Sequence, residues 1–291
     1  MPVQQLTKTD AFVVREIPNA PAVGLVRTAR KILVSSATDM ARSVSYTYGL
    51  YGLPIGGASA GLNHDGDGLD DAIAAFRDEL APHHAAGDLT LYAGKGIESS
   101  QMAGLADYTA DQFDQASAAT LVASAKAVRN GDLTGTRIAI EGDPPAAYPD
   151  ALVAAGAELV TVDGVEKKPW LIWGADADIV LAGSKVGALT HEGVPLVNAS
   201  SIIAWGPAAV TTKAFALLMA KEVMVVPAFL AVAGGYLLGH SQADDLVGAV
   251  DTAFTVAKAA DGDSLMIGAC KAAEAFIASW TDTKLFGRPF G

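Results

Sequence analysis

The stretch that decides how the first half of this chain folds is Leu53-Pro54-Ile55-Gly56-Gly57-Ala58-Ser59-Ala60-Gly61. Its apolar residues predict a strand that ends in a turn at the paired glycines. Around this stretch the pattern alternates between strands and helices. The expected elements are a strand at residues 22–26, a helix at 38–44, a helix at 69–80, a strand at 89–93 and a helix at 109–130.

After residue 131 the pattern changes to short apolar strands at intervals of about 20 residues, with a helix at residues 148–155 after the first strand. Such alternation predicts a Rossmann-like parallel sheet. The expected strands lie at residues 137–142, 158–163, 177–182, 195–198 and 223–226, and helices follow at 244–260 and 263–280. The sequence therefore predicts an α/β fold with two domains, residues 1–130 and 131–240, and helices within 241–291 that could pack back on the first domain.

The composition narrows the class of protein. The chain has 291 residues, of which 51% are hydrophobic and only 18% charged, and this fits a large buried core. A net charge of −12 argues against binding to nucleic acid or to an anionic membrane. The longest apolar run, residues 223–238, is too short and broken for a membrane span. One cysteine, Cys270, excludes an internal disulfide, and the start Met1-Pro2-Val3-Gln4-Gln5 has no leader pattern, so we expect a cytoplasmic protein.

Four blocks occur in a fixed order along the chain. They are Gly24-Leu25-Val26-Arg27 with residues 39–48 after it, the block at residues 53–61, Lys95-Gly96-Ile97-Glu98, and residues 225–235 with their Gly234-Gly235 end. In this order they resemble the glutamate, leucine, phenylalanine and valine dehydrogenases, a family of amino-acid dehydrogenases. The resemblance covers most of residues 20–240. It implies an N-terminal substrate and oligomerisation domain, a Rossmann-like domain of the dinucleotide-binding type, and a cleft between them.

Several of the family's chemical residues are replaced. Its turn reads Gly-Gly-Ala/Gly-Lys-Gly/Ala-Gly, and the catalytic lysine of that turn falls at Ser59. The lysine that holds the substrate α-carboxylate falls at Tyr48, and the catalytic aspartate falls at Gly94 or Lys95. Because a carboxylate needs a buried cation, and tyrosine offers only a neutral hydrogen bond, we expect a small-molecule ligand without a free α-carboxylate. The candidate catalytic or cleft-lining residues are Ser59, Tyr48 and Lys95, although an ordinary surface lysine is the favoured explanation of Lys95.

The cofactor motif is also altered. The family's Gly-x-Gly-x-x-Gly loop appears here as Ile140-Glu141-Gly142-Asp143-Pro144-Pro145, so only the middle glycine remains. Proline has no N–H to donate, and the acidic side chains bring negative charge toward a pyrophosphate, so these changes oppose NAD or NADP in the usual pose. Asp163 stands where an acid would hold an NAD ribose, or it merely ends a strand. The candidate cofactor-binding residues are Gly142, Asp143, Asp163 and Gly234.

Three further features have ordinary explanations. Asp65-Gly66-Asp67-Gly68 resembles part of a calcium loop but lacks the acidic residue at the twelfth position, so we interpret it as an acidic turn and predict no metal site. His64 could reach the cleft as an acid or base, or lie exposed in a loop. His83 and His84 are expected at a solvated helix end.

Three functions remain open at this point. One is a diverged NAD(P)-dependent oxidoreductase that acts on a small molecule. Another is a non-catalytic relative, a pseudoenzyme, that binds a small ligand or serves as a structural partner and does not bind NAD(P) in the usual way. The third is an enzyme of another reaction class that works without a nicotinamide cofactor. The resemblance implies a homo-oligomer in each case.

Overall fold

The computed structural model describes residues 3–291, and these form two compact units. The first unit runs to Phe113 and includes Ala273–Arg288 from the end of the chain. The second unit is Asp114–Ala272 with Pro289–Gly291. Each unit has its own five-stranded sheet.

The sheet of the first unit is mixed and has the order β1-β2-β4-β3-β5. β2 pairs antiparallel with β1 and β4, whereas β3 lies parallel to both β4 and β5. The strands are β1 (Val3–Gln5), β2 (Ala11–Arg15), β3 (Ala22–Ala29), β4 (Gly56–Asn63) and β5 (Leu89–Ala93). The strands predicted at residues 22–26 and 89–93 are confirmed, and the prediction missed β1 and β2.

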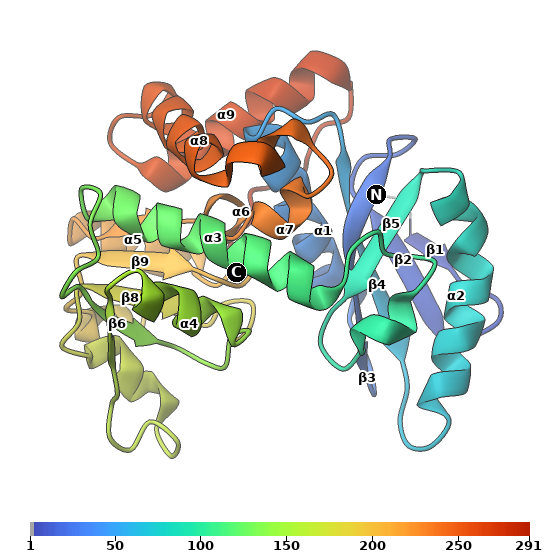
Figure 1. Ribbon diagram of the computed structural model, residues 1–291, viewed down its shortest axis with the longest axis horizontal. Coiled ribbons are helices and arrows are strands. Elements are labelled where there is room, and N and C mark those ends of the chain that lie inside the picture. Colours follow the sequence, from blue (N-terminus) through green and yellow to red (C-terminus); the bar gives the residue numbers. More distant parts are fainter. Residues whose placement is uncertain (1–2) are drawn as a thin grey trace. The chain divides into compact units, whose positions relative to one another are not determined.

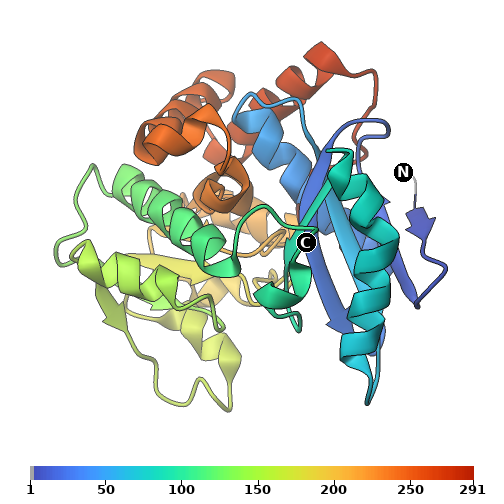
Figure 2. The same ribbon diagram turned by 45° about the vertical axis from the view of Figure 1, so that its right-hand side comes forward.

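The two faces of this sheet are covered by different helices. α2 (Leu69–Ala85) buries Ile73, Phe76 and Leu80 in the larger core cluster, and Figure 2 shows this helix along the sheet. α1 (Val34–Leu50) packs its alanines on the side of Phe12 and Val14. Both helices were predicted, although α1 is longer than the predicted residues 38–44. A short 3₁₀ helix, η1 (Ser99–Met102), follows β5.

The predicted turn at Gly56-Gly57 is wrong, because these residues begin the buried strand β4. A Cβ atom at Gly57 would lie 1.7 Å from the carbonyl oxygen of Ala41, and one at Gly24 would lie 1.8 Å from that of Ala58. Glycine at Gly57 therefore lets α1 lie directly on the strand backbone. Glycine lacks a side chain, which can permit a turn, but in β4 it permits the close approach of α1 to the strand.

The sheet of the second unit is parallel throughout and has the order β10-β9-β8-β6-β7. Figure 1 shows β6, β8 and β9 side by side. The strands are β6 (Arg137–Ile140), β7 (Glu158–Val160), β8 (Ile179–Ala182), β9 (Ser201–Ala204) and β10 (Met224–Val226). The helices that lie wholly in this unit are α4 (Ala147–Ala154), α5 (Thr212–Ala220), α6 (Ala228–Ala231), α7 (Gly234–Leu237) and α8 (Leu246–Ala260), with 3₁₀ turns η2 (Pro169–Gly174), η3 (Val194–Leu196) and η4 (Ser241–Asp245). Two further helices, α3 (Ala110–Val128) and α9 (Leu265–Trp280), cross the boundary between the units in the chain, so the first turn of α3 and the second half of α9 belong to the first unit.

The α/β class and the parallel sheet are confirmed, with one strand misplaced. Residues 195–198 were predicted as a strand, but Val194–Leu196 is the 3₁₀ helix η3, whose second residue is a proline. A proline suits the first turn of a helix because its missing N–H has no partner there in any case. The strand is β9, whose residues Ser201–Ala204 are all buried.

Candidate functional site

In the first unit the partly buried side chain of Arg27 has two guanidinium nitrogen atoms without a hydrogen-bond partner among the described residues. Arg27 lies near the carboxyl end of β3, and its Nε and Nη2 atoms are buried and make no hydrogen bond to any residue in the described range 3–291. Burial alone lowers the pKa of Arg27, and an arginine still keeps its charge near neutral pH. A buried charge without a counter-ion is unfavourable, so an anionic ligand would stabilise this group.

Ser59 lies on the same face of the sheet. The register pairs Leu25 with Ser59 and Arg27 with Gly61, and paired residues of neighbouring strands point to the same side. From the strand spacing and the rise per residue, the Cα atoms of Arg27 and Ser59 are about 8 Å apart. Ser59 is fully buried, and its Oγ atom also has no hydrogen-bond partner among the described residues. Two unsatisfied polar groups therefore share one face.

Gly94 adjoins Arg27 on the next strand. A Cβ atom at Gly94 would lie 3.0 Å from Cγ of Arg27 and 2.7 Å from the carbonyl oxygen of Val26. This packing leaves no room at Gly94 for the carboxylate that the resemblance places there or at the next residue. Lys95 follows in the turn, where its backbone oxygen accepts a hydrogen bond from the Thr28 amide at 3.0 Å and its side chain is exposed.

Tyr48 does not lie beside Ser59. The start of β4 contacts Ala41 and Ser45, and its end contacts Ile32 just before α1, so helix and strand run antiparallel. Tyr48 is buried on α1 beyond Ser45, past the Gly56 end of β4, whereas Ser59 lies in the middle of that strand. With 1.5 Å per helical residue and 3.3 Å per strand residue, the two lie roughly 14 Å apart along this direction.

The predicted histidines have local contacts. The Nε2 atom of His64 lies 3.1 Å from the carbonyl oxygen of Gly66 in its own loop. His83 and His84 do fall at the end of α2, but they are not simply solvated. Nδ1 of His83 is 3.1 Å from a carboxylate oxygen of Asp88, and Nε2 of His84 is 3.5 Å from one of Asp107.

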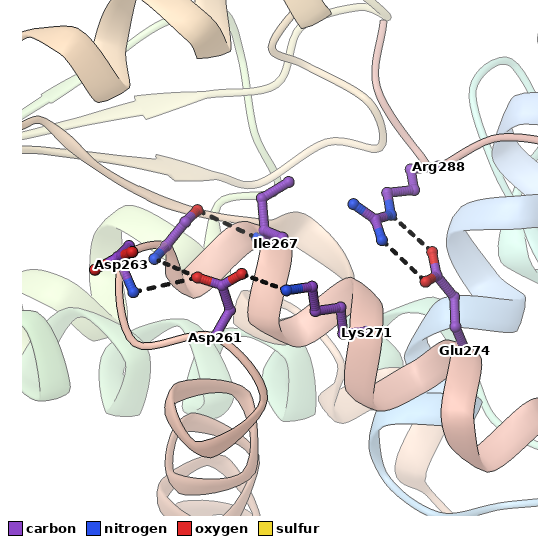
Figure 3. A network of polar contacts seen from close by, with 7 residues as sticks. Asp261, Asp263, Ile267, Lys271, Glu274 and Arg288 are labelled. Carbon is purple, nitrogen blue, oxygen red and sulfur yellow. Dashed lines mark hydrogen bonds and ion pairs between the residues drawn. The ribbon is translucent and has the colours of Figure 1, made fainter.

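Other charged clusters of the first unit are paired internally. Arg288 donates hydrogen bonds to both carboxylate oxygens of Glu274, at 2.7 and 3.0 Å, and Figure 3 shows the two side chains facing each other. The Tyr46 hydroxyl donates to the same carboxylate at 2.9 Å, and these three residues line a pocket of about 530 Å³. The buried Arg42 likewise binds Glu16, at 3.2 Å. In these clusters the cations already have carboxylate partners.

In the second unit, the carboxyl end of the sheet is organised around Glu141. β6 lies between β7, which follows it in the chain, and β8, and such a switch in strand order is where open α/β sheets bind ligands. One carboxylate oxygen of Glu141 accepts the backbone N–H groups of Gly183 and Ser184 at 2.9 and 3.0 Å, and the other accepts the Ser184 hydroxyl. The N–H and O–H groups of Gly183 and Ser184, which could bind an anionic ligand, are therefore already hydrogen-bonded to the Glu141 carboxylate.

The indole ring of Trp205, which follows β9, lies on the same edge. Its Nε1 atom donates to the carbonyl oxygen of Glu141 at 3.0 Å. A Cβ atom at Gly183 would lie 2.5 Å from the indole Cδ2, and one at Gly142 would lie 3.3 Å from Cζ2. The ring thus lies directly on the backbone of one glycine and beside another.

The predicted cofactor-binding residues have separate surroundings. Gly142 has a left-handed φ of +82°, and the Asp143 side chain after it is exposed. Asp163 is exposed three residues after β7 ends, because this strand is shorter than predicted. Gly234 is buried, its N–H donates to the Thr120 hydroxyl at 3.1 Å, and a Cβ atom there would lie 1.9 Å from the backbone of α3. Its position serves the packing of α7 on α3.

No family model matches the sequence, and no curated protein matches it. Solved structures do match. The hetero-hexameric glutamate dehydrogenase of Thermus thermophilus, solved with leucine bound, has 18% identity over 95% of this chain and 86% of that chain, with a TM-score of 0.79. The glutamate dehydrogenase of Plasmodium falciparum has 14% identity over 95% of this chain and 80% of that chain, with a TM-score of 0.74. The L-tryptophan dehydrogenase of Nostoc punctiforme has 16% identity over 92% of this chain and 91% of that chain, with a TM-score of 0.65.

The chain has the amino-acid dehydrogenase fold. The predicted resemblance and the two-domain α/β class with a Rossmann-like domain are confirmed at this level. Identities this low establish the fold and leave the activity to be argued from the site. The residues 3–291 contain no group of three or more histidine, cysteine, aspartate or glutamate side chains placed to hold a metal ion. Within the same range no helix is long and apolar enough to cross a membrane.

The fold implies a dinucleotide at the carboxyl end of the second sheet, and the residues there fit it poorly. The amides of Gly183 and Ser184 are bound by Glu141, and Trp205 lies on the adjoining backbone. Pro144 and Pro145 offer no N–H group to a phosphate. The residues at this edge therefore do not suit NAD or NADP in the usual pose.

The sequence argument missed three residues. Arg27 was noted only as part of a family block, although it supplies a partly buried cation that was not weighed when a ligand with an α-carboxylate was excluded. Glu141 was expected to face a pyrophosphate but binds backbone amides of the chain. Trp205 was not considered. An arginine inside a strand with no acidic residue at a neighbouring position was the one signal available for Arg27.

Proposed function

We propose that this protein binds a small anionic molecule on the α1 side of its first sheet and does not transfer hydride. The observation that supports this is the partly buried guanidinium of Arg27, whose buried Nε and Nη2 atoms have no partner among the described residues. A carboxylate bound there would make charge-assisted hydrogen bonds and neutralise the buried charge. The Ser59 hydroxyl, on the same face, supplies a second polar group.

Binding without catalysis is the better proposal for this site. General acid–base catalysis needs a group that exchanges a proton near the working pH, and a serine hydroxyl or an arginine does not do so unaided. Gly94 has no room for a carboxylate, and Lys95 is exposed in a turn. This corresponds to the non-catalytic alternative, a pseudoenzyme on a dehydrogenase scaffold.

The structural neighbours suggest which anions to try. They are glutamate and tryptophan dehydrogenases, and one was solved with leucine bound. We therefore choose glutamate, leucine and tryptophan, with simple mono- and dicarboxylates beside them and the corresponding neutral amides as controls. The earlier expectation of a ligand without an α-carboxylate predicts the opposite order of affinity.

Calorimetry on wild type and an Arg27→Met variant tests this proposal. We expect a carboxylate to bind wild type and to lose at least tenfold in affinity in the variant. Arg30→Met is the matched control, because Arg30 is exposed and pairs with Asp65 at the surface. The proposal fails if no carboxylate binds at millimolar concentration, if neutral amides bind as well as acids, or if Arg27→Met keeps the wild-type affinity.

A second candidate is an NAD(P)-dependent oxidoreductase, which the shared fold over 92–95% of the chain favours. NADH and NADPH titrations followed by cofactor fluorescence would test it. Absence of binding at millimolar cofactor would eliminate this candidate. If either cofactor binds, turnover of amino acids, amines and alcohols should be measured next.

We also propose a homo-oligomer with subunit contacts on the first 130 residues. The Thermus thermophilus neighbour is described as hetero-hexameric, which shows that this fold supports assembly in that protein. Light scattering of the purified protein tests the proposal, and a monomer at micromolar concentration would contradict it.

A further inference from the structure

The carboxyl end of the second sheet contains donors arranged as an anion site. The N–H groups of Gly183 and Ser184 follow β8 directly and both point at one oxygen of Glu141, at 2.9 and 3.0 Å. The Ser184 hydroxyl donates to the other oxygen. Convergent backbone N–H groups of this kind bind carboxylate and phosphate oxygens in many proteins.

The carboxylate that fills this site has no other partner to balance its charge. No lysine, arginine or histidine of the described chain forms an ion pair with Glu141, so its charge is offset by the three donors. Hydrogen bonds to a charged acceptor are about twice as strong as neutral ones. Glu141 therefore acts toward β8 as a bound anion would.

Trp205 closes the site from the β9 side. Its indole donates to the backbone oxygen of Glu141 at 3.0 Å and rests on Gly183, where no side chain larger than hydrogen would fit beneath it. Gly206 packs equally closely, since a Cβ atom there would lie 2.1 Å from the Gly183 oxygen. The glycines that would let a ligand approach the backbone are covered by the chain itself.

We infer that Glu141 and Trp205 are a built-in occupant of this crevice. The donors of Gly183 and Ser184 form a site for one carboxylate or phosphate group, Glu141 keeps the site filled, and Trp205 covers it. An external oxyanion binds there only by displacing the Glu141 carboxylate. This inference does not rest on the ligand proposed for Arg27, since every residue involved belongs to the second unit.

The test is to remove the internal carboxylate and offer an external one. Glu141→Ala should bind inorganic phosphate or acetate at least tenfold more tightly than wild type in calorimetry. Asp143→Ala is the matched control, because it removes the same charge from the same loop but Asp143 is exposed and makes no contact with these donors. It should behave as wild type. Adding Ser184→Ala to Glu141→Ala should remove much of the gained affinity.

Two further measurements keep the inference falsifiable if Glu141→Ala does not fold. Glu141→Gln keeps the side-chain shape without the charge, and it should gain a smaller part of the anion affinity. NADH at millimolar concentration should not bind wild type. The inference is overturned if folded Glu141→Ala or Glu141→Gln binds phosphate no more tightly than Asp143→Ala, or if wild type binds NADH.

Discussion

Two arginines of the first unit have buried guanidinium nitrogen atoms but differ in their partners, and Arg27 is only partly buried as a residue. Arg42, on α1, is 7% exposed and binds Glu16 at 3.2 Å and Asp39 at 3.3 Å. Arg27, on β3, also has buried nitrogen atoms but no hydrogen-bond partner for two of them among residues 3–291. Burial alone does not indicate function for either residue. The presence or absence of an acidic partner separates an arginine that stabilises the fold from one that is available to a ligand.

The largest expected effect comes from breaking the paired site. Arg42→Met leaves the Glu16 carboxylate buried at 3% exposure without its cation, so the free energy of unfolding should fall by about 3–5 kcal/mol. Urea denaturation at neutral pH measures this change. The control is Arg30→Met, whose exposed pair with Asp65 should contribute less than about 1 kcal/mol. Equal losses of unfolding free energy in the two variants would show that the buried pair of Arg42 and Glu16 stabilises the fold no more than an exposed pair.

Arg27→Met should act in the opposite direction. Removing an unsatisfied buried polar group without replacing its hydrogen bonds should raise the free energy of unfolding by about 1–3 kcal/mol when no ligand is present. The same urea experiment applies, repeated with the best carboxylate from calorimetry, which should stabilise wild type but not the variant. A loss of stability as large as that of Arg42→Met would mean that Arg27 has a structural partner. The distinction between a paired Arg42 and an unpaired Arg27 would then be wrong.

Two buried serines repeat the comparison on a smaller scale. Ser45 accepts the Gly57 N–H at 2.8 Å, whereas the Ser59 hydroxyl has no partner among the described residues, and both are fully buried. Ser45→Ala leaves an unsatisfied amide and should lower the free energy of unfolding by about 1–2 kcal/mol. Ser59→Ala should be neutral or stabilising by up to about 1 kcal/mol. If Ser59→Ala is the more destabilising of the two, its hydroxyl is bonded within the fold.

The sequence predicted the regular parts of this fold well, because their patterns are local. The helix that buries Ile73, Phe76 and Leu80 shows its period directly, and so does the strand at residues 89–93. The glycines of β4 were misinterpreted because a glycine permits either a turn or a close approach. Only the contact of Gly57 with α1 distinguishes the two.

The site was less predictable because it depends on which charges are paired. Ser59 was chosen from a family position and does lie on the face of Arg27, but Tyr48 lies on α1, roughly 14 Å from Ser59 along the strand direction. Sequence spacing does not reveal that Arg42 has a partner 26 residues away, or that Glu141 binds amides 42 and 43 residues away. The roles of Arg42 and Glu141 both depend on contacts between residues far apart in the sequence, and local sequence patterns do not predict such contacts.

The smallest effect concerns pH and shows how far pairing compensates for burial. Burial raises the pKa of Glu16 above its ordinary value of 4.5, although the neighbouring Arg42 acts to lower it. The folded protein therefore holds this proton to a higher pH than the unfolded chain. The contribution of Glu16 to stability is greatest below pH 4.5 and is lost as the pH rises through the raised pKa.

The free energy of unfolding of wild type minus that of Glu16→Gln, measured by urea denaturation between pH 4 and 7, should thus decrease with pH. A difference that grows with pH would mean that Arg42 outweighs burial and holds the pKa of Glu16 below 4.5. In the expected case even the paired arginine only partly offsets burial, which makes an unpaired Arg27 all the less favourable without an anion beside it.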